Sequence, residues 1–295
     1  MGDIMVSTTL ERPEKFRIGR VFSNSFAVIG RNLGLLVGLA ALFSALPALV
    51  LNLWNYRNFA NLDFASPETD PSAFLGNSLI STAFGLIYFV LALLFQSSLV
   101  RATIEDLNGK RPAIGDCVQI ALRCIFPTLG IGLVVFLTAF LAMVVMMFVA
   151  GILIPVFGTA IAFVAFMALL VPGIMLLLGV SVSVPVLIQE RLGVFGSMSR
   201  SRALTKGSRW SLFGLLLILL LAAIAIQMAF ALVFGLAFAL TGSLSTVGLI
   251  VGAIGSSVVS TVVATVISVA IAVSYVELRQ VKEGTSVDEL AEIFA

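Results

Sequence analysis

Residues 190–210, ERLGVFGSMSRSRALTKGSRW, form a short basic connector between two very long apolar runs. A polar segment in this position is typical of a chain that leaves a membrane and then enters it again. We therefore expect the connector to lie at a water boundary. It contains five of the seventeen Lys and Arg residues of the chain and ends on a tryptophan: Arg191, Arg200, Arg202, Lys206, Arg209 and Trp210.

The composition of the whole chain agrees with this reading. The 295 residues are 60% hydrophobic and only 11% charged, with a mean hydropathy of +1.15. An ordinary soluble domain has about 25% charged residues, so this chain lacks the polar surface that a water-soluble globule needs. The composition predicts an all-α polytopic transmembrane bundle, in which helices satisfy their own backbone groups inside lipid. The net charge of +2 is too small to indicate a nucleic-acid partner.

Six segments are long and apolar enough to cross a hydrocarbon core of about 30 Å. They are residues 33–54, 75–100, 129–150, 158–189, 211–240 and 247–276. Segment 158–189 would measure about 48 Å as a straight helix, which is too long for one upright pass. We interpret it as one tilted or kinked span, broken at Pro172 and Gly173, and a re-entrant segment is the alternative.

The distribution of Lys and Arg predicts the orientation of these spans. The lead-in, the connectors 101–125 and 190–210 and the C-terminal segment contain nearly all of them, whereas the three intervening loops contain Arg57 alone. Because positive residues favour the cytoplasm, both termini are expected there. The polar tail 1–15 has no apolar core, so we expect no cleavable signal peptide.

Three polar segments at the expected cytoplasmic side precede pairs of spans. Residues 16–31 and 112–126 are amphipathic and are expected to lie in the interface, although 16–31 could also be a direct lead-in to the first span. With the connector 190–210, they suggest three units of an interfacial segment followed by a hairpin, at 16–107, 112–190 and 192–283. Coincidence is the alternative, because residue identity between the units is weak.

The last ten residues, 286–295 (SVDELAEIFA), predict an acidic amphipathic helix that begins with a capping box. Anionic lipid would repel its acidic face. We therefore expect this helix to dock on the basic connector, while cations that stay free contact lipid headgroups.

The sixth span has small residues at every fourth position. Such a stripe lets helix backbones approach closely in lipid. A contact within the chain is one reading, and a homo-oligomer interface or contact with another membrane protein is the alternative. The stripe consists of Gly248, Gly252, Ser256, Ser260, Ala264 and Ser268.

The sequence offers few groups for catalysis. It has no histidine, and its two cysteines, Cys117 and Cys124, are too few for a metal site. The middle thirds of the spans contain no charged residue, and no phosphate-binding glycine loop is present. We therefore expect no enzyme activity, no metal and no cofactor.

Several short motifs resemble one bacterial polytopic membrane family. They are residues 16–19 (FRIG), 171–174 (VPGI), 204–210 (LTKGSRW), 275–279 (YVELR) and 282–284 (KEG). The family is related to the membrane domain that precedes some glycerophosphoryl diester phosphodiesterases. The resemblance implies a bacterial inner-membrane location, but not the phosphodiesterase activity, because that activity belongs to a separate catalytic domain that uses histidines.

These observations predict a non-enzymatic inner-membrane protein that organises lipid or partner proteins at the cytoplasmic face. Membrane lipids are the expected partners, and the cations of the connector are the expected contacts. The alternative is a transporter or channel for an apolar or lipid-like substrate, and a membrane-embedded enzyme has the least support.

Overall fold

The computed structural model describes residues 16–60, 71–241 and 246–283, and all regular structure in these ranges is helical. The six predicted spans correspond to six long apolar helical segments, so the chain is an all-α, multi-pass integral membrane protein, as predicted. These segments are Leu33–Asn55, Ser78–Leu107, Ile125–Val149, Val171–Glu190, Arg209–Ala237 and Val247–Glu283. The tail 1–15 and the acidic helix expected at 286–295 lie outside the described residues.

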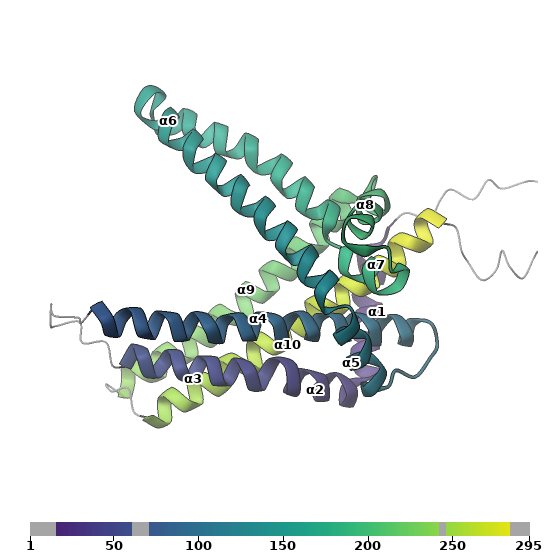
Figure 1. Cartoon of the computed structure of the whole chain (residues 1–295), viewed down its shortest axis with the longest axis horizontal. Coiled ribbons are helices and arrows are strands. Elements are labelled where there is room, and N and C mark those ends of the chain that lie inside the picture. Colours follow the sequence, from purple (N-terminus) through teal and green to yellow (C-terminus); the bar gives the residue numbers. More distant parts are fainter. Residues whose placement is uncertain (1–15, 61–70, 242–245, 284–295) are drawn as a thin grey trace, which may run out of the picture.

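The first part of the chain forms a short helix followed by two spans (Figure 1). Helix α1 (Ile18–Arg31) ends at Asn32, where the backbone leaves helical geometry and turns into the first span. That span consists of α2 (Leu33–Ala40), the π-helical turn η1 (Ala41–Ala45) and α3 (Leu46–Ala60), and the second is α4 (Pro71–Leu107).

The second part begins with α5 (Ile114–Arg123) and continues in the long hairpin α6 (Ile125–Val180). The hairpin reverses at Gly158, whose φ of 80° and ψ of 173° are strongly disfavoured for residues with a Cβ atom. Figure 1 shows its two arms projecting away from the other spans. The reversal lies at the first residue of the predicted span 158–189.

The predicted break at Pro172 and Gly173 is wrong. Backbone angles stay helical through both residues, and α6 ends only at Val180. A helix in lipid tolerates one proline when neighbouring groups compensate for the lost hydrogen bond. The interruption falls instead at Ser181 and Val182, before α7 (Ser183–Glu190). In a continuous helix the ring of Pro185 would clash with the carbonyl of Ser181, four residues earlier.

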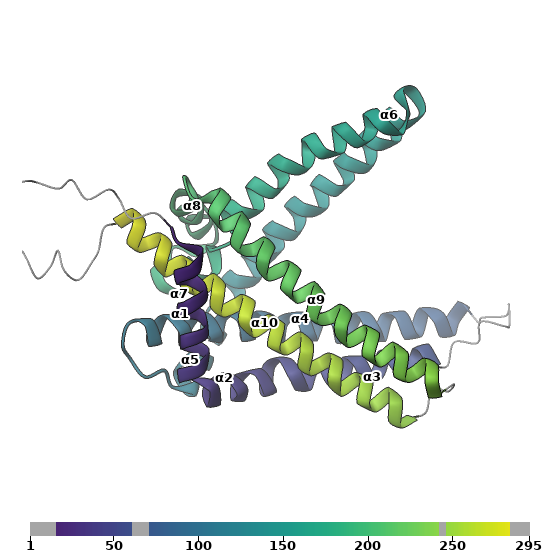
Figure 2. The ribbon, with the colours of Figure 1, turned by 180° about the vertical axis from the view of Figure 1, so that it is seen from behind.

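The third part consists of α8 (Gly193–Thr205) and two further spans, α9 (Arg209–Thr241) and α10 (Thr246–Glu283). The chain therefore presents a short helix and two spans three times in succession, in the order that the sequence suggested. Figures 1 and 2 show α1, α5, α7 and α8 gathered at the same end of the bundle, which we call the connector end.

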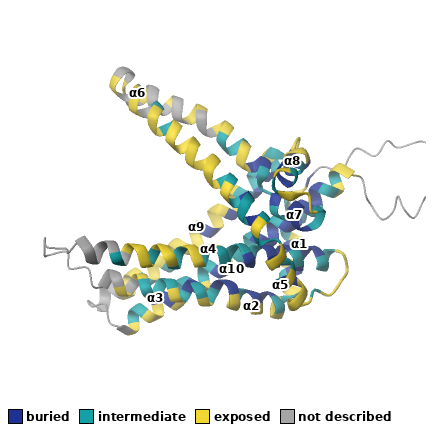
Figure 3. Cartoon of the chain, in the orientation of Figure 1, coloured by how far each residue is buried: buried dark blue, intermediate teal, exposed yellow. Residues whose placement is uncertain are grey.

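Helix α10 is the centre of the bundle, with contacts to α1, α3, α4 and α9. The main core lies near the connector end, where α10 buries Val269, Val273, Tyr275 and Leu278. Figure 3 shows buried residues concentrated there, whereas much of α6 and the far ends of α3, α4 and α9 are exposed and apolar. Such surfaces are stable against lipid but not against water.

Candidate functional site

Helix α8, which contains most of the basic connector, packs on the base of the α6 hairpin at two glycines. A Cβ atom on Gly130 would lie 2.8 Å from Cγ2 of Val194, and one on Gly179 would lie 3.3 Å from Cγ of Arg202. The hydroxyl of Ser201 donates a 2.8 Å hydrogen bond to the carbonyl of Gly179. Because these two glycines have no side chain, α8 can lie close against both arms of the hairpin.

The arms and α8 line a half-open cavity of about 560 Å³, a size that suits a lipid-like or drug-sized molecule. Along the first arm it extends from Val135 to Met147, about 18 Å of helix. Its walls are almost entirely apolar. They include Val135, Thr138, Ala139, Met143, Met146 and Met147 of the first arm, Gly173, Leu176 and Leu177 of the second, and Met198 of α8.

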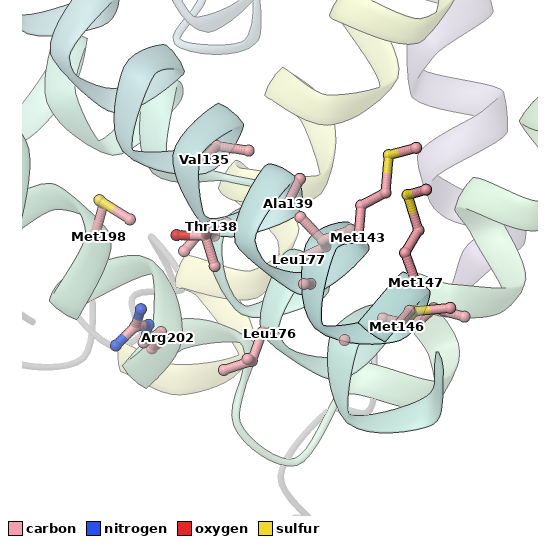
Figure 4. A pocket seen from close by; sticks show the side chains of 14 residues that line it. Val135, Thr138, Ala139, Met143, Met146, Met147, Leu176, Leu177, Met198 and Arg202 are labelled. Carbon is pink, nitrogen blue, oxygen red and sulfur yellow. The ribbon is translucent and has the colours of Figure 1, made fainter. Parts of the chain in front are cut away.

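Arg202 gives this cavity a polar end. Figure 4 shows Arg202 with Met198 at one end of the lining, and Met143, Met146 and Met147 at the other. Among the residues that the structure describes, no carboxylate pairs with its guanidinium. A cation at the end of an apolar cavity with flexible methionines favours an anionic amphiphile.

The other cations of the connector have different surroundings. Arg200 lies between two carboxylates, with Nε donating to Glu190 at 3.0 Å and Nη2 bonding to Glu283 of α10. Tyr275 donates to the same Glu190, at 3.0 Å. Arg279 donates to Glu283, at 2.7 Å. Arg200 therefore joins α8 to α7 and α10, and is not available for lipid.

The remaining predicted contacts lie apart from the cavity. Arg191 ends α7 in the left-handed conformation, at a φ of 53°, and its side chain and that of Lys206 are exposed. Arg209 is half-buried, and its Nε has no hydrogen-bond partner within the described part of the chain. Trp210 is 70% exposed and packs edge-on against Phe213, with ring centroids 6.1 Å apart.

Helix α1 combines core packing with an exposed side. It buries Val21 and Val28, and Arg20 reaches the buried Glu277 of α10 at 3.5 Å. Phe26 of the same helix is 60% exposed. At the end of α1, Arg31 bonds to Asp106 at 2.5 Å, which raises the pKa of the guanidinium.

The small-residue stripe of α10 meets several helices of the same chain. Gly252 faces the ring of Phe234 on α9, and Ser256 accepts a 3.1 Å hydrogen bond from Asn52 of α3. Ala264 packs at the edge of the core between α2 and α4. Ser268 is buried, and Gly248 and Ser260 are half-buried. These contacts agree with the intramolecular reading of the stripe.

Sequence reasoning missed the methionines and Thr138 that form the cavity. The signal was present in residues 143–147, MVVMM, which concentrate three of the nine methionines of the chain. Hydropathy does not distinguish such a run from ordinary lipid-facing residues.

Comparison of the chain with protein-family models, curated proteins and solved structures found no match. The site must therefore be interpreted from its own chemistry.

Proposed function

We propose that this membrane protein is non-enzymatic and binds anionic lipid at the cytoplasmic face, with the cavity between α6 and α8 as the binding site. The observation that supports this most directly is the position of Arg202, a cation without an acidic partner in the described residues, at the end of an apolar cavity. The phosphate would meet the guanidinium, and an acyl chain would lie along the methionines.

Exposed side chains at the connector end support the proposal that this end faces the cytoplasm. Arg191, Lys206 and Trp210 are exposed around α8, and exposed cations and tryptophan favour the headgroup level of an anionic leaflet. The relationship to the membrane domain of glycerophosphoryl diester phosphodiesterases remains part of the proposal and rests on the short motifs.

Retention of anionic lipid by purified protein tests the site. We expect the wild type to retain phosphatidylglycerol over phosphatidylcholine in native mass spectrometry, and Arg202→Gln to lower this retention about tenfold, because one charge-assisted contact is lost. Arg202→Lys should keep part of the preference.

Arg57→Gln is the control, because it removes an exposed cation of α3 that lies outside the connector and does not line the cavity. A second variant, Ala139→Phe, fills the cavity without changing charge and should also displace the lipid. Equal phosphatidylglycerol retention in wild type, Arg202→Gln and Ala139→Phe would disprove the proposed site.

Transport of a lipid-like substrate is the weaker candidate, because a helix broken at Pro172 and Gly173 would have indicated a transport site, and the helix continues through both residues. A liposome assay with fluorescent phospholipid separates the two functions. Binding without flux supports the lipid-organising role, whereas rapid flux that Arg202→Gln abolishes would favour transport.

A further inference from the structure

A second cavity, of about 320 Å³, lies between α3, α4, α9 and α10 and shares no residue with the first. Its lining includes Asn52, Tyr88, Gln227, Ser256 and Ser260. Tyr88 and Gln227 each lie thirteen residues inside one end of the predicted spans 75–100 and 211–240. Thirteen helical residues measure about 20 Å, so this cavity lies inside a bilayer core of about 30 Å.

Hydrogen bonds within the protein leave part of this polar lining unsatisfied. Asn52 Nδ2 donates to Ser256 at 3.1 Å and to Ser257 at 3.0 Å, which leaves its carbonyl oxygen as an acceptor. Ser260 donates to the carbonyl of Ser257 at 3.1 Å, so its oxygen can only accept. Within the described part of the chain, the Tyr88 hydroxyl and the Gln227 amide have no hydrogen-bond partner.

Unsatisfied polar groups at this depth favour a polar occupant, because lipid tails cannot replace the missing hydrogen bonds. Among the described residues, no charged side chain lines the cavity, which favours an uncharged occupant. The acceptors Asn52 and Ser260 require a hydrogen-bond donor, which esters and quinones lack and an alcohol supplies. Ile226 and Met228, on either side of Gln227, are 49% and 67% exposed, so the occupant enters from the lipid.

We propose that this cavity binds the free hydroxyl of an uncharged lipid alcohol, whose hydrocarbon chains lie along the exposed faces of α4 and α9. Diacylglycerol and polyprenol both have this chemistry. The site is independent of Arg202 and of the anionic lipid proposed for the first cavity.

Photocrosslinking with a photoreactive diacylglycerol tests this site on full-length protein in nanodiscs of zwitterionic lipid. We expect crosslinks on α4 and α9 next to the cavity. Unlabelled dioleoylglycerol should compete, and its 3-acetyl ester should not, because acetylation removes the only donor. This comparison uses wild-type protein alone, so it does not depend on the folding of a variant. Stronger competition by polyprenol than by dioleoylglycerol would identify the second source of the same hydroxyl.

Substitution of the two unsatisfied groups provides the second readout. Tyr88→Phe and Gln227→Leu should each lower crosslinking about tenfold, because each removes one hydrogen bond to the hydroxyl of the lipid alcohol. Thr82→Val on α4 is the matched control outside the cavity and should keep wild-type labelling. Equal labelling of wild type and both cavity variants, or equal competition by the acetyl ester, would overturn the proposal.

Discussion

The two cysteines differ in how deeply their thiols are buried, and therefore in the surroundings that raise the pKa of each thiol. Cys117 is fully buried on α5, and burial, assisted by the negative charges of Glu105 and Asp116, raises the pKa of its thiol from 9.0 to about 11. Cys124 is half-buried, and burial raises its pKa while the positive charge of Arg191 opposes the shift. Because the thiolate is the reactive form, Cys117 should be the less reactive of the two.

Alkylation of the native protein checks this difference. At pH 8 we expect peptide mapping to find Cys124 modified well before Cys117. Between pH 9 and about 11 the native state keeps the Cys117 proton while an unfolded chain loses it, so the contribution of this thiol to stability decreases as the pH rises. Equal labelling rates at pH 8 in the native protein, with Cys124→Ser as the single-thiol control, would contradict the prediction.

At the scale of elements, α9 and α10 pack aromatic rings against glycines. Phe230 and Phe234 stack with ring centroids 6.0 Å apart, and their rings approach Gly255 and Gly252. A Cβ atom on Gly252 would lie 2.3 Å from Cζ of Phe234, closer than any side chain can come without movement. The close approach of the two helices depends on the absence of that atom.

We predict that Gly252→Leu destabilises the protein by about 1–3 kcal/mol, the usual cost of overpacking. Thermal unfolding in detergent, followed by fluorescence, would measure the loss. Phe234→Ala in the same chain should recover part of it by making room, and Val251→Leu, on an exposed face of α10, should be neutral. An unchanged Tm together with loss of a dimer in size-exclusion chromatography would instead favour the oligomer reading of the stripe.

At the scale of the whole molecule, Arg200 connects parts of the fold that are far apart in sequence. Helix α8 packs on the α6 hairpin, and the bonds of Arg200 to Glu190 and Glu283 join α8 to α7 and to the end of α10. The hairpin has few other contacts with the central bundle, so this network helps to determine where the first cavity lies relative to α10.

Removal of this connection should loosen the hairpin without unfolding the bundle. We expect Arg200→Gln to cost about 1–3 kcal/mol, the range for hydrogen bonds to charged groups, and to speed hydrogen exchange in α8 and the base of α6. Arg123→Gln, which removes an exposed cation of α5, is the control. If hydrogen exchange in α8 of the Arg200→Gln variant is as slow as in the wild type, packing at Gly130 and Gly179 is enough to hold the hairpin in place.

The predictions from sequence were most accurate where local chemistry decides the structure. The six spans follow from hydropathy, and the reversal at Gly158 lies where the third predicted span gives way to the fourth. The predicted break at Pro172 and Gly173 is wrong, because a proline interrupts a helix only when its surroundings do not compensate, and the interruption lies before Pro185 instead. The expected contacts of the connector with lipid and with the C-terminal helix stay predictions, and its cations have separate surroundings, as Arg200 and Arg202 show.

The amino-acid sequence alone determined that this is an all-α membrane protein with six spans, because lipid obliges every spanning segment to satisfy its own backbone. Only the tertiary structure decided which apolar faces meet. Leucine, valine and methionine are equally stable against lipid and against another helix, so hydropathy contains no information on that choice. For the same reason the grouping of Arg202 with the three methionines, and of Asn52 with the distant Ser256, became recognisable only in the folded chain.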